Sequence, residues 1–111
     1  MIVRTWSATA TSAGAESYSR YFAGTLLPQL RTLPGFEGAY LLRRDLASGG
    51  TVELTAHTFW ESLDAIRAFA GDDFARSVVE PEAQAMLATF DPTAAHRTVV
   101  LDARGNRRPR L

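Results

Sequence analysis

The segment TVELTAHTFWESLDAIRAFAG, residues 51–71, decides the fold, because it joins the pattern of a strand to the pattern of a helix. Over residues 51–60 the side chains alternate in character, as is typical of a strand with two different faces. One of these faces consists of Val52, Leu54, Ala56, Thr58 and Trp60. From residue 62 the apolar residues recur at helical spacing instead. The segment therefore predicts a strand that is followed directly by a helix.

The boundary between the two elements carries the signals of a helix start. Ser62 can cap the helix, because its hydroxyl can accept a free backbone N–H of the first turn. Asp64 places a negative charge near the positive end of the helix dipole, and Gly71 ends the apolar run. We therefore expect Trp60 at the last position of the strand, where its indole closes one end of the space between sheet and helix.

The rest of the chain predicts three further strands and further helical segments. Residues 2–9, 36–45 and 96–102 have the composition of strands, and the Gly-bearing connection after residue 45 predicts a hairpin. Residues 13–33 predict a helix in which Pro28 removes one backbone donor, so we expect a kink or break near Gly24 and Thr25. Residues 74–79 predict one or two helical turns, and Pro81 predicts the start of a short helix that extends to about residue 88.

This order of elements, βαββα(α)β, predicts a ferredoxin-like α+β domain over residues 1–102. Two right-handed split βαβ units give an antiparallel four-stranded sheet in the order 4-1-3-2, with the helices on one face. The other face would carry Thr55, His57 and Phe59, which are too apolar for free solvent. A second copy covering that face is the economical solution, so we expect a homodimer, a dimeric α+β barrel.

Residues 103–111 form a basic C-terminal tail, with four arginines among Gly, Asn and Pro. Two interpretations of this tail remain open. It is a solvated and poorly ordered end, or it is an arm that docks on the partner subunit or on an acidic ligand.

The composition of the 111 residues excludes several classes of function. The chain has no cysteine, which excludes disulfides, thiolate nucleophiles and Cys-ligated metals. Its formal net charge is zero, which argues against nucleic acid and anionic membranes as partners. No apolar run approaches the ~20 residues of a membrane span, and no signal peptide is visible, so we expect a cytoplasmic protein. With two histidines and no dinucleotide or flavin motif, we expect neither a metal nor a cofactor.

Five stretches of the sequence together resemble a known family. They are MIVRTW (1–6), LPGFEGAYLLRRD (33–45), FWESLDAIRAFAGDD (59–73), VVEPEAQAMLATFD (78–91) and HRTVVL (96–101). They resemble the antibiotic biosynthesis monooxygenase (ABM) domain of the dimeric α+β-barrel superfamily, over nearly the whole chain apart from the tail. The resemblance is specific for the fold, whereas the superfamily contains oxygenases, haem-degrading enzymes and isomerases.

The resemblance transfers residue by residue. The tryptophan that lines the substrate cavity of the quinone-forming monooxygenases matches Trp60. The asparagine and tyrosine of that site fall on Ala56 and Ile66. In the haem-degrading branch, the tryptophan that distorts the haem falls on Phe69, and the haem-ligating histidine falls near Val79, so the resemblance does not imply haem degradation here.

The resemblance implies a cofactor-independent monooxygenase that acts on a small aromatic or polyketide-like substrate with dioxygen. In that chemistry the substrate loses a proton and its carbanion reduces dioxygen, while the protein supplies a base and a dry cavity. The alternative is a member of the superfamily that binds or isomerises a small ligand without oxygen chemistry.

The candidate site residues follow from residue chemistry and from this resemblance. We expect His96 as the general base, because histidine titrates near neutrality, and Trp60 as a positioning donor. The alternative for each is a structural role, His96 as a hydrogen-bonded histidine and Trp60 as a core aromatic. His57 is expected at the interface between two sheets. The expected substrate-binding residues are Trp6, Tyr40, Arg44, Ile66 and Phe69.

Overall fold

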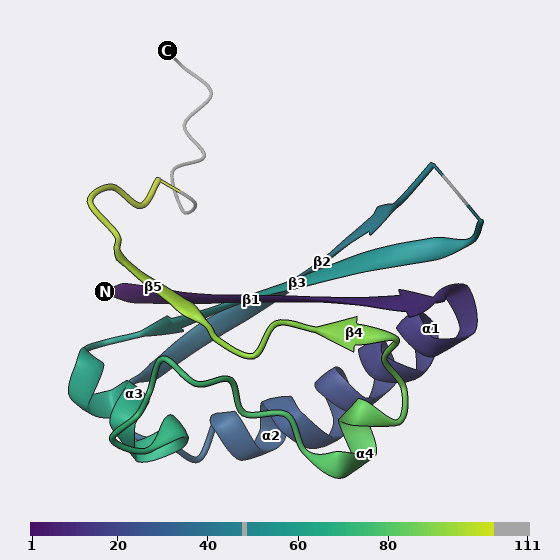
Figure 1. Cartoon of the computed structure of the whole chain (residues 1–111). Coiled ribbons are helices and arrows are strands. Elements are labelled where there is room, and N and C mark those ends of the chain that lie inside the picture. The colour runs from purple at the N-terminus through teal and green to yellow at the C-terminus, as the bar shows by residue number, and fades with distance from the viewer. Residues whose placement is uncertain (48, 104–111) are drawn as a thin grey trace.

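A computed structural model describes residues 1–47 and 49–103 as one sheet covered on one face by helices (Figure 1). Strand β3 (Thr51–Trp60) lies inside the sheet, between β2 (Phe36–Asp45) and β1 (Ile2–Thr11), and both pairings are antiparallel. Burial alternates strictly along β3, and its even-numbered residues are the buried ones. The predicted strand, hairpin and register of residues 36–60 are therefore confirmed.

The other edge of β1 is occupied by two short strands where the sequence predicted one. Strand β4 (Thr89–Phe90) pairs with the end of β1, and β5 (Ala95–Thr98) pairs with its beginning. Pro92 lies between them and has no N–H for a ladder, so the chain leaves β1 there. Strand β5 ends at Thr98 rather than at residue 102. Thr98 pairs with Ile2, the first residue of β1, so no strand among the described residues lies opposite the residues that follow. The strand order 4-1-3-2 is confirmed, with the fourth strand divided in two.

One helical run lies beneath the sheet and consists of α1 (Ser12–Tyr21), the π-helical turn η1 (Phe22–Leu26) and α2 (Leu27–Leu30). Within the run, the backbone N–H of Leu27 donates to the carbonyl of Phe22, five residues earlier. Pro28 has no N–H to continue the α-helical pattern, so a widened turn precedes it. The predicted irregularity near Gly24 and Thr25 thus takes the form of a π-helical turn.

The second half of the helical layer is shorter than predicted. Helix α3 (Leu63–Ala70) begins as expected, with the Ser62 hydroxyl accepting from the backbone N–H of Ala65 at 3.2 Å, and it ends at Gly71, whose φ of +84° suits glycine. Helix α4 is only Pro81–Gln84. The prediction of helical turns over residues 74–79 was wrong. Residues 74 and 75 form a single turn closed by the N–H of Arg76 donating to the carbonyl of Asp73 at 3.1 Å, Arg76 then forms an isolated bridge with Thr93, and residues 77–79 are irregular.

A β-bulge near the start of β2 reverses the faces of that strand. Phe36 packs its ring edge-on against Trp60 on the helix side, but the register slips between Phe36 and Gly38, where φ is +151°. Beyond the bulge Tyr40 pairs with His57, on the face away from the helices. A slip of one residue moves every later side chain to the other face, so the bulge decides where the rest of β2 points.

The core fills the space between the sheet and the helices as two clusters of buried side chains. One cluster centres on Tyr18, Phe22 and Leu54, and the other on Leu30, Trp60 and Ile66. Among the described helices none is long and apolar enough to cross a membrane. The predicted tail lies outside the described residues, except for Ala103.

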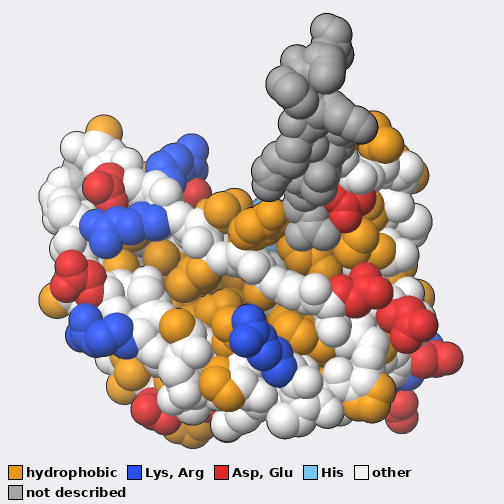
Figure 2. Space-filling view, turned by 180° about the vertical axis from the view of Figure 1, so that it is seen from behind, with side chains coloured by type: hydrophobic (Ala, Val, Ile, Leu, Met, Phe, Trp, Pro, Cys, Tyr) orange, Lys and Arg blue, Asp and Glu red, His pale blue; other side chains and the backbone are white. Residues whose placement is uncertain are grey.

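The uncovered face of the sheet, named here the open face, mixes hydroxyl and aromatic side chains. Thr5 Oγ1 lies 2.9 Å from His57 Nδ1, and Ser7 Oγ lies 2.9 Å from Thr55 Oγ1. Figure 2 shows the molecule from behind, with hydrophobic side chains across the middle of the view, where basic side chains also lie, and acidic side chains mostly toward its edges.

The homodimer predicted from the sequence stays a prediction, and the open face supplies its test. Leu42 lies on this face and is 46% exposed, whereas Leu63 lies on α3 and is 39% exposed. Light scattering on the wild type should give twice the mass of one chain, because a dimer hides the apolar part of the face. Leu42→Glu should give the single-chain mass, and the matched control Leu63→Glu should remain dimeric. A wild type that stays monomeric at micromolar concentration would contradict the prediction.

Candidate functional site

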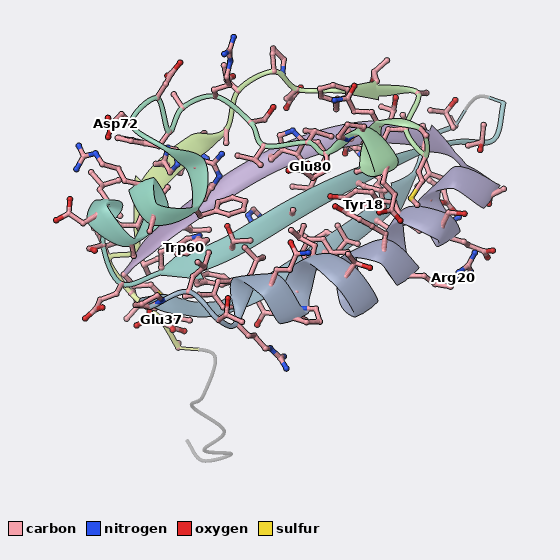
Figure 3. The ribbon with its side chains drawn as sticks, turned by 90° about the horizontal axis from the view of Figure 1, so that it is seen from below. Tyr18, Arg20, Glu37, Trp60, Asp72 and Glu80 are labelled. Carbon is pink, nitrogen blue, oxygen red and sulfur yellow. The ribbon has the colours of Figure 1, made fainter. Side chains whose placement is uncertain are left out.

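A cavity of ≈ 50 Å³ lies between the sheet and the helical layer. Its sheet side is formed by β1 and β3. Its opposite side is formed by the helical run, by Phe69 of α3 and by residues 77 and 78 of the irregular segment between α3 and α4. We name residues 71–80 the roof segment. Figure 3 shows Tyr18 directed between the helical run and this segment, with Trp60 nearer to α3. The cavity therefore lies on the helix side of the sheet.

The walls of the cavity are mainly aromatic and aliphatic. Its aromatic members are Trp6, Tyr18, Phe22 and Phe69. Trp6 packs against Tyr18 with ring centroids 6.0 Å apart, and Tyr18 packs against Phe22 at 6.2 Å. Such walls suit the flat apolar face of an aromatic ligand. Two predicted site residues, Trp6 and Phe69, thus line the cavity.

Arg4 is the polar centre of this cavity and was not among the predicted site residues. It lies on β1 between Ile2 and Trp6, it is 5% exposed, and it is the one charged residue that is buried in the described part of the chain. Its Nη1 donates to the carbonyl of Phe74, and its Nη2 donates to the carbonyl of Arg76 at 3.0 Å. Burial lowers the pKa of Arg4, but a guanidinium stays charged at any physiological pH.

His96 lies beside Arg4 and not in the lining of the cavity. The two residues are paired in register, and Arg4 Nη1 lies 2.8 Å from His96 Nε2. Arginine can only donate, so Nε2 is the acceptor and the proton of the neutral ring is on Nδ1. Burial, and then the charge of Arg4, lower the pKa of His96. The predicted role of general base does not fit this geometry, because the acceptor nitrogen of His96 is already engaged.

The hydroxyl of Tyr18 is a second polar group of the cavity, and unlike Arg4 it has no hydrogen-bond partner among the described residues. Tyr18 is 3% exposed and lines the cavity, and no hydrogen bond joins its hydroxyl to another described residue. Burial, and then Tyr21, raise the pKa of Tyr18 well above its ordinary value. The phenol therefore stays protonated at neutral pH and can donate to a ligand oxygen.

Trp60 supports the cavity from behind and does not line it. Its side chain is fully buried, its ring stacks on Phe69 with centroids 5.6 Å apart, and its Nε1–H donates to Thr58 Oγ1 at 2.9 Å. Ile66 is also fully buried and packs with Leu30 in the same cluster. The two predicted ligand contacts, Trp60 and Ile66, are therefore core residues in this structure, because α3 lies directly on the end of β3.

Tyr40 and Arg44 lie away from the cavity, on the open face. Tyr40 packs edge-on against Phe59 at 5.6 Å, and Arg44 pairs with Glu53 at 3.0 Å. The prediction that they bind substrate beside Trp60 does not fit, and the bulge at the start of β2 is the physical reason. His57 is on the same open face, as predicted.

One sequence signal could have identified Arg4. The even-numbered residues of β1 form an otherwise apolar series, Ile2, Trp6, Ala8 and Ala10, and Arg4 interrupts it. A charge inside an apolar face is unusual and marks a candidate site. The partners of Arg4 carry no such signal, because they are backbone carbonyls more than 60 residues away.

Solved structures of other proteins share this fold, although no sequence comparison finds a relative. No family profile and no curated sequence matches the chain. Among solved structures, a Bacillus cereus protein assigned as an antibiotic biosynthesis monooxygenase is 17% identical, with a TM-score of 0.61 and coverage of 91% of this chain and 94% of that chain. The cofactor-independent oxygenase SnoaB from Streptomyces nogalater is 21% identical, with a TM-score of 0.58 and coverage of 93% and 97%.

A third similar structure is the haem degrader MhuD from Mycobacterium tuberculosis, with two haems bound in its active site. It is 25% identical, with a TM-score of 0.56 and coverage of 92% of this chain and 98% of that chain.

The resemblance to the ABM domain that the sequence indicated is confirmed at the level of the fold, and so is the predicted ferredoxin-like α+β class.

The residues of this cavity do not fit a haem ligated by histidine. Neither histidine lines the cavity, since His57 is on the open face and His96 Nε2 accepts from Arg4. Val79, the residue near which the sequence resemblance places the family's haem ligand, lines a neighbouring cavity of ≈ 40 Å³. A haem titration of the wild type should therefore give no histidine-ligated Soret spectrum at micromolar concentration. The variant Val79→His tests the alignment, and a histidine-ligated spectrum in the wild type would contradict it.

The hydrogen bond between Arg4 and His96 predicts a pH effect on stability. The pKa of His96 is lower in the folded chain than its ordinary value of 6.5, so the unfolded chain binds this proton more readily. The contribution of His96 to the free energy of unfolding is fully present above pH 6.5. It falls as the pH drops from that value toward the lower pKa of the folded chain. Urea unfolding at pH 7 and pH 5 should show a smaller loss for His96→Gln than for the wild type, because glutamine accepts from Arg4 without titrating. Equal losses in the two proteins would contradict the assignment.

Proposed function

We propose that this chain is a monooxygenase that acts without a cofactor on a small aromatic or polyketide-like substrate. The observation that carries the proposal is an aromatic-walled cavity that is lined by Tyr18, whose hydroxyl has no partner among the described residues. The fold shared with SnoaB, a cofactor-independent oxygenase, supports the same reaction class.

The walls would hold the flat substrate and exclude water. Trp6 and Phe22 flank Tyr18, and Phe69 is held in place by its stack on Trp60. The Nε1–H of Trp6 donates to the carbonyl of Asp91 at 2.9 Å, so its indole presents an apolar face and has a fixed orientation. A positioned substrate in a cavity without water favours reaction with dioxygen over proton leakage to solvent.

Tyr18 would stabilise the oxygen on which negative charge develops. A substrate that contains a CH₂ group beside an aromatic ketone loses a proton to form an enolate, and a protonated phenol can donate to the enolate oxygen. The enolate passes one electron to dioxygen, and the resulting pair forms a carbon–oxygen bond that becomes a hydroperoxide. Loss of water leaves a carbonyl, so CH₂ and O₂ become C=O and H₂O. Among the side chains lining the cavity, none is a carboxylate or histidine base, so the substrate would lose its proton to water and enter as the anion that Tyr18 stabilises. The peroxide formed by addition of dioxygen takes up a proton from water in turn, so the protons balance.

Entry of a substrate requires movement of the cavity cover. The two cavities, ≈ 50 and ≈ 40 Å³, share Tyr18, Phe69 and Val78 among their lining residues, and each is far below the ~300 Å³ of a typical ligand site. Val78 lies on the roof segment, which has no helix or strand of its own. Displacement of the part of this segment around Val78, beyond the carbonyls of Phe74 and Arg76 that Arg4 holds, would join the two cavities into one space for a fused-ring ligand.

Oxygen uptake tests the proposal. With an anthrone or a reduced hydroxynaphthalene as substrate, the wild type should consume one O₂ per product formed, and ¹⁸O₂ should place one labelled atom in the new carbonyl. Tyr18→Phe should lower kcat roughly 10²-fold, the usual cost of one lost donor to an oxyanion. The control Tyr40→Phe makes the same change on the open face and should keep full turnover. Tight binding of these compounds without oxygen uptake would contradict the proposal and favour the alternative of a ligand-binding or isomerising protein.

A further inference from the structure

We infer that the cavity takes its ligand as an aromatic oxyanion, held by the guanidinium of Arg4, which His96 positions. This inference names the substrate class for the function proposed above and rests on that function for the reaction, but not for the binding.

The charge of Arg4 has no acidic partner in the described part of the chain. The ion pairs found there join Arg43 to Asp45, Arg44 to Glu53 and Arg67 to Asp64, and all three lie at the surface. An isolated charge in an apolar interior is costly unless an opposite charge or several hydrogen bonds compensate it. The carbonyls of Phe74 and Arg76 compensate Arg4 in part, which leaves a net positive charge facing the cavity.

A count of donors shows where a ligand would bind. A guanidinium has five N–H groups. Both N–H groups of Nη1 are used, by Phe74 and His96, and one N–H of Nη2 is used by Arg76. The N–H of Nε and the second N–H of Nη2 have no partner among the described residues. The atoms Nε and Nη2 lie on the same edge of the planar guanidinium. Their two N–H groups can donate to the two oxygens of a carboxylate, or both to a single oxygen of a ligand.

His96 acts on the ligand only through Arg4. Its Nε2 accepts from Nη1, and its ring packs edge-on against Phe74 with centroids 5.2 Å apart. The histidine and the Phe74 carbonyl therefore hold Nη1 on the side away from the ligand, and they leave the Nε edge free. His96 is a positioning residue.

The surroundings restrict the ligand to a planar aromatic anion. The Arg4 guanidinium lies 5.7 Å from the centre of the Phe69 ring, so its charge is placed at the end of an aromatic wall. Tyr18 adds a neutral donor in the same cavity. A carboxylate and an ionised phenol or enol share the chemistry that this site recognises, a planar oxyanion attached to a ring.

Binding of matched probes tests the inference, with the intrinsic tryptophan fluorescence as the signal, because Trp6 lies in the cavity wall and Trp60 stacks on Phe69 of that wall. At pH 7 and low salt the wild type should bind 1-naphthoate at least about tenfold more tightly than its neutral isostere 1-naphthamide, because hydrogen bonds to a charged group are the strong ones. Arg4→Gln should lose this preference while it still binds the amide, and Arg4→Lys should regain part of it. Arg31→Gln, at an exposed arginine beyond α2, is the matched control and should behave as the wild type.

A second measurement needs no variant and separates the two sources of the anion. Bound 4-nitro-1-naphthol should ionise at a lower pH than the free compound, which its colour reports directly. A preference for naphthoate indicates a carboxylate ligand. A lower ionisation pH of the bound naphthol, without that preference, indicates a phenolate ligand. Either result supports the inference. If the wild type shows neither effect, or if Arg4→Gln keeps both, the inference is wrong.

The role of His96 has its own readout. His96→Leu should weaken naphthoate binding and leave naphthamide binding unchanged, and His96→Gln should restore the preference for naphthoate, because glutamine can also accept from Arg4. Unchanged naphthoate binding in His96→Leu would exclude the positioning role. Failure of the inference is distinguishable from failure of the proposed function. Selective binding of anions without oxygen uptake refutes only the proposed reaction. Oxygen uptake from neutral substrates, if it persists in Arg4→Gln, refutes only the inference.

Discussion

The hydrogen bonds of one buried arginine hold the parts of this site together. Arg4 lies on β1, and its side chain joins this strand to the roof segment through two carbonyls and to β5 through His96. The roof segment has no regular structure of its own, and it contacts the sheet edge through the bridge between Arg76 and Thr93. A charge cannot remain in an apolar interior without such partners, so Arg4 requires the roof segment to stay where its carbonyls reach.

The same constraint explains how a small domain can keep a charged group beside a mainly apolar cavity. Carbonyl dipoles and a neutral histidine stabilise the guanidinium without neutralising it, whereas a carboxylate would cancel its charge. Burial keeps the charge away from water, where screening would weaken its attraction for a ligand. The proposed chemistry depends on this arrangement, because an ionised aromatic substrate is stabilised by fixed donors and not by a mobile base.

The departures from the predicted structure have local causes. At Pro92 the missing N–H ends pairing with β1, and the last strand is therefore divided. At the start of β2 the bulge beside Gly38 reverses the alternation, which moves Tyr40 and Arg44 to the open face. Neither event changes the order of the strands. Each one changes where individual side chains point, and this is why the predicted fold was confirmed while part of the predicted site was not.

Sequence alone determined the elements whose signal is local and repeated. Period-two alternation in β3, the cap at Ser62 and the glycine at position 71 are properties of neighbouring residues, and they were sufficient for the strand and the helix. The order of such elements along the chain, with the handedness of βαβ units, was sufficient for the sheet order. The tertiary structure decided the site, because its partners are far apart in the chain. Arg4 meets His96, 92 residues away, only through the pairing of β1 with β5, and it meets the carbonyl of Phe74 only through the path of the roof segment. Backbone carbonyls are present at every position, so no residue type in the sequence shows which of them will accept from a buried arginine.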